Sequence, residues 1–147
     1  MMPCAMTDTA RCPRLAALAA HRSETPTDYL YLGTKDDGQS SFETRNLIFA
    51  QADFAPPAPP MGVSPAIPAK ALLFLTLPPG WRDDAHRSPR EQIALCLSGR
   101  MRVRSSTGDV RIVEPGGMWH MADTSGAGHA SEVVGDEPVR LAIVQLV

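Results

Sequence analysis

Short runs of apolar residues, separated by turns rich in glycine and proline, recur along most of this chain. They cover residues 71–77, 92–98, 101–105, 110–113, 118–121, 131–134 and 139–147. None of them shows the three-to-four-residue spacing of an amphipathic helix. Short strands at near-regular spacing, without a helical period, are typical of a β-sandwich or β-barrel. The pattern therefore predicts an all-β protein.

Two further strands are expected before this region. Residues 29–32 form an apolar run ahead of the turn Asp36-Asp37-Gly38, and residues 42–50 follow with Leu47-Ile48-Phe49 as their apolar centre. Six prolines then fall within residues 56–68. Proline cannot donate a backbone hydrogen bond inside a sheet, so this segment is predicted to be an extended surface loop.

The strand over residues 92–98 has two unlike faces, because alternate side chains point to opposite sides of a sheet. Gln92, Ala94 and Cys96 share one face, and bulky aliphatic side chains form the other. With Gln92 directed into a barrel, its small neighbours would leave a cavity. The aliphatic face requires a cover, either the N-terminal segment, the proline-rich loop or a second subunit. We expect a homodimer with an exchanged or overlaid N-terminal arm.

The length of 147 residues suits a single domain. Residues 1–24 contain an alanine-rich stretch and are interpreted as an N-terminal arm, with the barrel domain over residues 25–147. The apolar stretch at 15–20 is too short for a signal peptide, and no run approaches the roughly 20 residues of a membrane span. A cytoplasmic protein without membrane contact is expected.

The net charge and the cysteine content bear on the protein's binding partners and on its redox compartment. The formal net charge is −2, so no basic surface for nucleic acid or an anionic membrane is indicated. The three cysteines form neither an even set nor a CxxC pair. Cys96 lies within an apolar run, which predicts a buried thiol in a reducing compartment.

Two blocks of residues carry a recognisable spacing. The first is Gly80, His86, Ser88, Gln92 and Gly99, and the second is Pro115, Gly116, Gly117 and His120. This spacing resembles the paired motifs of the cupin superfamily, and small single-domain bacterial cupins in particular. The resemblance implies a double-stranded β-helix, or jelly-roll barrel, with its motifs within residues 71–147.

In cupins the first motif supplies two histidines and a glutamate to a metal ion, and the second motif supplies a third histidine. Carried over by position, His86 matches the first histidine and His120 the last, whereas Ser88 and Gln92 replace the other two ligands. The resemblance thus implies a metal site of His86, Gln92 and His120. Nitrogen and amide ligands do not select among Fe, Ni, Cu, Zn and Mn for one divalent ion.

The same region offers acid/base chemistry without a metal. His86 or His129 could move a proton near neutral pH, with Asp123 or Asp84 orienting an imidazole. Arg90 could hold a carboxylate or phosphate of the ligand. The segments His86–Gln92 and Asp123–His129 also resemble a subgroup of small bacterial cupins with a His-x-x-Pro-Arg-x-Gln core and a Gly-rich turn ending in histidine.

Two functions follow as expectations. The first is an enzyme acting on a small organic molecule inside the barrel, by isomerase, lyase or dioxygenase chemistry. The second is a non-catalytic cupin that binds or senses a small ligand, with Ser88 and Gln92 marking lost catalysis. Both place His86 and His120 together beside Gln92.

Overall fold

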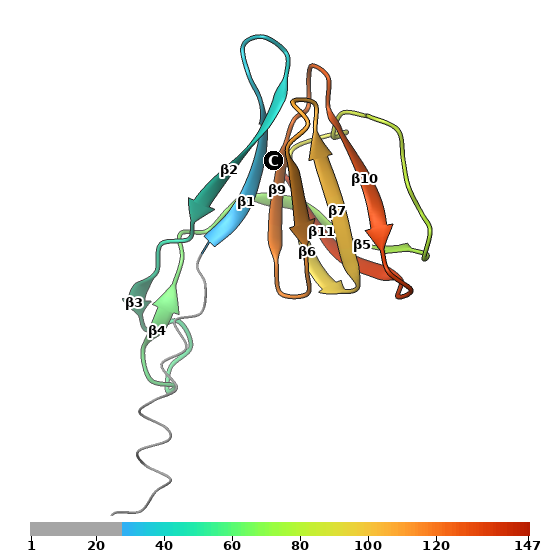
Figure 1. Cartoon of the computed structure of the whole chain (residues 1–147). Helices are drawn as coiled ribbons and strands as arrows, with labels where there is room; N and C mark the ends of the chain where they lie inside the picture. Colours follow the sequence, from blue (N-terminus) through green and yellow to red (C-terminus); the bar gives the residue numbers. More distant parts are fainter. Residues whose placement is uncertain (1–27) are drawn as a thin grey trace, which may run out of the picture.

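A computed structural model describes residues 28–147. Every regular element in that part of the chain is a β-strand (Figure 1). The predicted arm over residues 1–24 lies outside the described residues. No helix long and apolar enough to cross a membrane occurs in residues 28–147. The eleven strands are β1 (Asp28–Thr34), β2 (Ser40–Asn46), β3 (Ala50–Ala52), β4 (Met61–Val63), β5 (Ala69–Leu77), β6 (Gln92–Ser98), β7 (Arg100–Ser105), β8 (Val110–Val113), β9 (Met118–Ala122), β10 (His129–Val134) and β11 (Val139–Leu146).

Two sheets enclose the core. The larger has the order β2-β1-β9-β6-β11-β5, and the smaller has the order β10-β7-β8. Neighbouring strands are antiparallel except β1 and β9, which run parallel. The crossings between strands distant in sequence give the jelly-roll barrel that the resemblance implied.

The inner faces of both sheets meet in a closely packed core. Gln92, Ala94 and Cys96 do face inward, as the alternation predicted, with exposed fractions of 8%, 0% and 3%. The cavity expected beside them is instead occupied by large side chains from other strands. The core includes Leu32, Met101, Val103, Val113, Trp119, Met121, Val133, Val139, Leu141 and Ile143. Side chains of the barrel therefore fill its interior.

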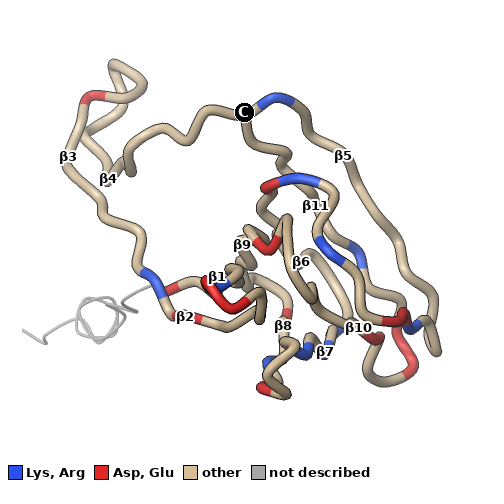
Figure 2. The backbone as a smooth tube through the Cα atoms, turned by 90° about the horizontal axis from the view of Figure 1, so that it is seen from above, with Lys and Arg blue, Asp and Glu red and all other residues tan. Residues whose placement is uncertain are grey.

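The segment between β2 and β5 departs from the prediction. β2 ends at Asn46, so Ile48 and Phe49 lie beyond the sheet with exposed fractions of 74% and 50%. The proline-rich region is not wholly loop, because β4 within it pairs with β3 as a short hairpin. We call residues 47–68 the arm, a segment separate from the predicted N-terminal arm over residues 1–24. It projects away from the barrel (Figures 1 and 2).

The buried thiol of Cys96 gives a first prediction. Burial raises the pKa of this thiol, because a low-dielectric environment disfavours the thiolate. We expect Cys96 to resist iodoacetamide at neutral pH in the folded protein and to react in denaturant, as read by peptide mass mapping. A raised pKa in the folded state contributes stability below the pKa of the unfolded thiol, and that contribution is lost as the pH rises through the folded value.

The Cys96→Ala variant is the control for this pH dependence. It should show a smaller loss of unfolding free energy at alkaline pH than the wild type. Equal labelling of Cys96 in the folded and denatured protein would contradict the prediction.

Candidate functional site

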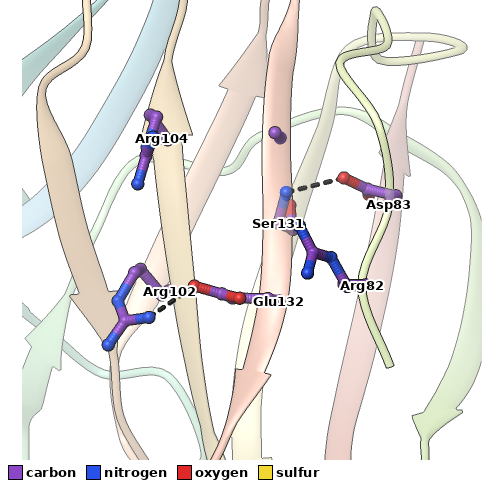
Figure 3. A pocket seen from close by; sticks show the side chains of 7 residues that line it. Arg82, Asp83, Arg102, Arg104, Ser131 and Glu132 are labelled. Atoms are coloured by element: carbon purple, nitrogen blue, oxygen red, sulfur yellow. Dashed lines mark hydrogen bonds and ion pairs between the residues drawn. The ribbon is translucent and has the colours of Figure 1, made fainter. Parts of the chain in front are cut away.

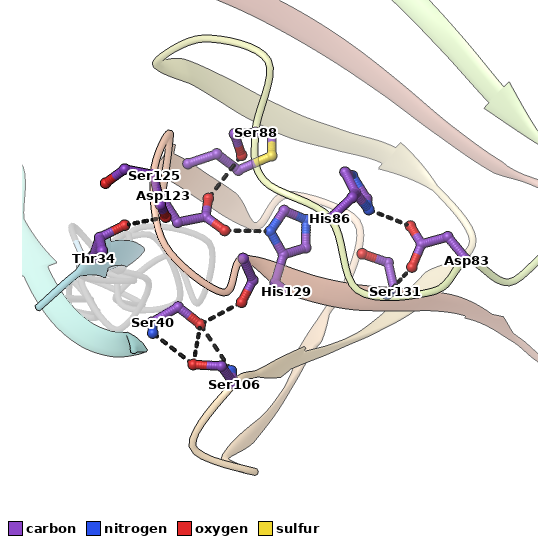
Figure 4. A network of polar contacts seen from close by, with 12 residues as sticks. Thr34, Ser40, Asp83, His86, Ser88, Ser106, Asp123, Ser125, His129 and Ser131 are labelled. Atoms are coloured by element: carbon purple, nitrogen blue, oxygen red, sulfur yellow. Dashed lines mark hydrogen bonds and ion pairs between the residues drawn. The ribbon is translucent and has the colours of Figure 1, made fainter. Parts of the chain in front are cut away.

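Two histidines meet at one end of the barrel, where the chain before β6 runs beside the start of β10. His86 and His129 form a two-residue antiparallel bridge, with each backbone N donating to the other's carbonyl oxygen at 2.9 Å. Their ring centroids lie 4.8 Å apart. Figure 4 shows both rings in one polar network. The backbone pairing places the two imidazoles together.

A glycine makes this close approach possible. Gly128 has φ = +71°, and a Cβ at that position would lie 2.1 Å from the carbonyl oxygen of His86. Only a residue without a side chain fits there. The turn is held from the other side by Ser40, whose Oγ donates to the Gly128 carbonyl at 2.6 Å. The hairpin of β1 and β2 thus fixes the position of His129.

Asp123 is the centre of the buried part of the site. Its side chain has no exposed surface, and both carboxylate oxygens are used. Ser88 Oγ donates to Oδ1 at 2.7 Å, and His129 Nδ1 donates to Oδ2 at 2.6 Å. Because His129 Nδ1 is committed to Asp123, only Nε2 of that ring is left for another partner. The ring orientation of His129 is therefore fixed.

His86 forms the exposed part of the site. Its side chain is 49% exposed, and its Nδ1 lies 3.3 Å from Asp83 Oδ2 and 3.3 Å from the carbonyl oxygen of Asp84. Asp83 Oδ1 accepts a hydrogen bond from the backbone N of Ser131 at 2.7 Å, which fixes this carboxylate. Asp83 Oδ2 is buried and makes no well-aligned hydrogen bond. The polar group beside this oxygen is Nδ1 of His86. Each histidine thus has its own aspartate.

The predicted meeting of His86 and His120 does not occur. His120 lies on the outer face of the large sheet, where its Nε2 contacts Glu91 Oε1 at 2.7 Å and its ring lies against Tyr31. On β9 the inward positions belong to Trp119 and Met121. Trp119 packs against His129 with ring centroids 5.1 Å apart. The indole is large, and burying it yields more free energy than burying an imidazole.

The other predicted site residues are also separated. Gln92 is buried, and its Nε2 contacts Met121 Sδ at 3.8 Å rather than either histidine. Arg90 is exposed and forms no ion pair with any residue in 28–147. Of the predicted residues, the structure brings together His86, His129 and Asp123.

Two contributors were missed. Asp83 takes the orienting role that was expected of Asp84, and its signal was its place three residues before His86. Ser88 was interpreted as a lost metal ligand, whereas it donates to Asp123. Its partner lies 35 residues away in sequence, so no local pattern indicated this contact.

The donor set does not fit a catalytic metal ion. No group of three or more His, Cys, Asp or Glu side chains is placed to hold a metal within the described part of the chain. The site offers two imidazoles, and both oxygens of Asp123 already accept hydrogen bonds. A catalytic zinc site uses three protein ligands. The set His86, Gln92 and His120 is also divided between two faces of the sheet.

A second polar feature lies on the outside of the smaller sheet. A cavity of about 140 Å³ is lined by Arg82, Asp83, Arg102, Arg104, Ala130, Ser131 and Glu132 (Figure 3). Arg102 donates to Glu132, and this hydrogen bond is the main cause that lowers the pKa of the Glu132 carboxyl. The arginines of β7 therefore lie on an outer face, partly paired with acids.

One protein family matches the sequence of this chain. A family model described as a cupin domain matches residues 73–145. The chain is similar to the cupin domain of Schizosaccharomyces pombe Cnp3, with 15% identity over 82% of this chain and 84% of that chain and a TM-score of 0.46. It is similar to a Cupin 2 conserved barrel domain protein from Salinispora arenicola, with 18% identity, 69% and 76% coverage and a TM-score of 0.44.

A conserved protein of unknown function from Streptococcus pyogenes is a further similar structure. Its identity is 21% over 52% of this chain, and its TM-score is 0.42. The chain covers 63% of that protein, which is less than two thirds of its length. No curated protein matches the sequence.

Proposed function

The chain belongs to the cupin superfamily, and from this premise we propose that it is an enzyme that transfers a proton on a small organic molecule at the mouth of the barrel. The observation that carries the proposal is the pair of histidines 4.8 Å apart, each with its own aspartate. Packing of the barrel alone does not require a half-exposed His86 side chain beside the buried His129 side chain. Such an arrangement suits isomerase or lyase chemistry.

His86 is the acid/base in this proposal. Its Nδ1 faces Asp83 and the Asp84 carbonyl oxygen, so Nε2 is the nitrogen left for a ligand. His86 takes a proton from the substrate at Nε2, and the Asp83 carboxylate stabilises the imidazolium that forms. The same nitrogen then returns the proton to the product or to the leaving group. The charge and proton count balance without a further reactant.

His129 and Asp123 act behind His86 as positioning residues. The hydrogen bond of 2.6 Å between them fixes the ring of His129, and Ser88 fixes the carboxylate. The His129 ring in turn limits the positions open to His86. A fixed base is effective because the geometry of proton transfer is set before the substrate arrives.

The mouth offers space for a ligand beside His86. An open depression of about 530 Å³ is lined by Ala85, His86, Arg87, Ser88, Pro89, Thr124, Gly126 and Ala127. Sites for small molecules commonly measure about 300–1,000 Å³. Arg87 supplies a cationic group in this wall, in the role that was expected of Arg90. A small organic acid therefore suits the site best.

A ligand-binding cupin without catalysis is the second candidate. The observation that favours it is the filled barrel, in which Trp119 and the aliphatic core occupy the space where a substrate would otherwise be enclosed. An open depression excludes water poorly, and exclusion of water strengthens the electrostatic interactions of an active site. The experiment must therefore separate proton transfer from binding.

Solvent exchange provides that separation. Small hydroxy, keto and amino acids are first screened for binding by ligand-detected NMR, and each bound compound is then incubated with the protein in D₂O. We expect deuterium to enter a carbon position of at least one bound compound, and His86→Gln to slow that exchange by roughly 10²–10⁴-fold.

His120→Gln is the matched control, because His120 also contacts a carboxylate but lies on the outer face. It should leave the exchange rate unchanged. Binding without any exchange would favour the ligand-binding candidate. Exchange that is unaffected by His86→Gln would refute the role of His86.

A further inference from the structure

Three arginines gather on the outer face of the smaller sheet, around the cavity of about 140 Å³ described above. Arg102 and Arg104 are alternate residues of β7, and the residues beside them, Met101 and Val103, are buried. Alternate side chains share one face of a strand, so both guanidinium groups lie outside the core. Arg82 approaches from the chain before β6 (Figure 3). The cavity therefore lies between arginines of two different segments.

Glu132 of β10 is the acid that holds these arginines near one another. It is paired with Arg102 on one side and bridged to Arg82 on the other. Residues paired in this way point to the same side of a sheet. The hydrogen bond from Arg102 is the largest cause that lowers the pKa of the Glu132 carboxyl, and the charges of Arg82 and Arg104 add to it. All three guanidinium groups thus act on one carboxylate.

One carboxylate cannot neutralise three guanidinium groups. The other acid in the lining, Asp83, has its oxygens directed to the Ser131 backbone N and to His86. Among residues 28–147, neither Arg82 nor Arg104 forms an ion pair. The cavity therefore carries an excess of positive charge in a chain whose formal net charge is −2.

Ala130 gives this positive charge a place to hold a ligand. It is paired with Arg104 across the sheet and is the smallest residue that lines the cavity. Ala130 and Glu132 are alternate residues of β10, roughly 7 Å apart along the strand, so an anion above Ala130 is separated from the acid. The cavity is smaller than the roughly 300–1,000 Å³ of most small-molecule sites. It suits one anionic group, with the rest of the ligand in solvent.

We propose that this cavity binds a dianionic phosphate group, either inorganic phosphate or that of a small phosphomonoester, above Ala130 and between Arg82 and Arg104. Arginine forks donate two hydrogen bonds to phosphate oxygens. A phosphomonoester carries a charge of about −1.5 to −2 and three acceptor oxygens, so it can accept from guanidinium groups on different sides. A carboxylate has one charge and two oxygens. The proposal does not depend on the proton transfer proposed above.

The test titrates the full chain, labelled with ¹⁵N, with inorganic phosphate and with glycerol 3-phosphate at constant ionic strength. Arginine Nε–H resonances report the binding directly. We expect a dissociation constant below about 1 mM for at least one of the two, because a few charge-assisted hydrogen bonds give such affinity. Tighter binding of glycerol 3-phosphate would identify the ligand as a phosphomonoester, and equal or tighter binding of inorganic phosphate would identify free phosphate. A larger dissociation constant for both would overturn the proposal.

Arginine variants locate the ligand. Arg82→Gln and Arg104→Gln should each weaken binding by roughly 10–100-fold, because each removes charge-assisted hydrogen bonds to the phosphate. Arg100→Gln is the matched control, since Arg100 lies on the same face of β7 but beside Glu114 and outside this cavity. It should bind phosphate as the wild type does. Equal losses from all three variants would contradict a defined site.

Ala130→Leu tests the cavity itself, because it fills the space and leaves every charge in place. It should weaken phosphate binding by about tenfold or more through a steric clash, with an unchanged circular dichroism spectrum. Unchanged affinity would mean that phosphate is attracted only diffusely to the surface. Acetate should bind about tenfold more weakly than phosphate. Equal binding of acetate, or of an oligonucleotide that has only phosphodiester groups, would also overturn the proposal.

Discussion

Replacing Asp123 by alanine is expected to lower the free energy of unfolding by about 3–5 kcal/mol. The carboxylate has no exposed surface and accepts hydrogen bonds from both Ser88 and His129. Its removal leaves a buried imidazole and a buried hydroxyl without partners, and unpaired buried polar groups are costly. Urea denaturation followed by circular dichroism measures the change. The variant should also lose proton exchange, because the orientation of His129 is no longer fixed.

Glu91→Ala is the matched control for this loss. Glu91 makes a similar contact with a histidine, at 2.7 Å from His120, but its side chain is 52% exposed. Exposed ion pairs contribute about 0–1 kcal/mol, so the variant should unfold nearly as the wild type does. Equal losses of unfolding free energy in the two variants would show that the buried Asp123 contacts stabilise the fold no more than the exposed Glu91 contact does.

Gly128→Ala is expected to be the other strongly destabilising change, with a loss of about 3 kcal/mol or more. The left-handed conformation alone costs a residue with a side chain about 1–2 kcal/mol. The new Cβ would lie 2.1 Å from the His86 carbonyl oxygen, so the two segments must separate. Separation weakens the two backbone hydrogen bonds between His86 and His129, which contribute about 0.5–1.5 kcal/mol each.

Gly135→Ala separates conformational strain from the clash. Gly135 has φ = +87°, and a Cβ there would meet nothing within 4 Å. This variant should lose only the cost of the left-handed conformation. Nuclear Overhauser effects between the rings of His86 and His129 should persist in Gly135→Ala and disappear in Gly128→Ala. Equal unfolding free energies for the two variants would contradict this account of the site.

The strands of the barrel were largely predictable because their signals are local. Glycines with positive φ lie in the turns at Gly99, Gly108 and Gly135, each between two strands. The alternation along β6 also predicted that Gln92, Ala94 and Cys96 share a buried face. The arm was less predictable, since the apolar run at residues 47–49 favoured a strand. These residues lie beyond the sheet, where nothing in the local pattern shows whether a neighbour is available.

The site was predictable only in part. His86, His129 and Asp123 were candidates from their residue types, and they do converge. The spacing of the second motif placed His120 with them. Spacing along a strand assigns a residue to one of two faces but does not say which face is inside.

The sequence by itself determined the all-β architecture, the turns and the residues that share each face of a strand. Those properties depend on backbone conformation and on side-chain alternation over a few neighbouring residues. The tertiary structure decided that Trp119 is inside and His120 outside, and that Asp83 and Ser88 complete the histidine pair. These outcomes depend on which large side chains compete for the same enclosed volume, and that competition is between strands far apart along the chain.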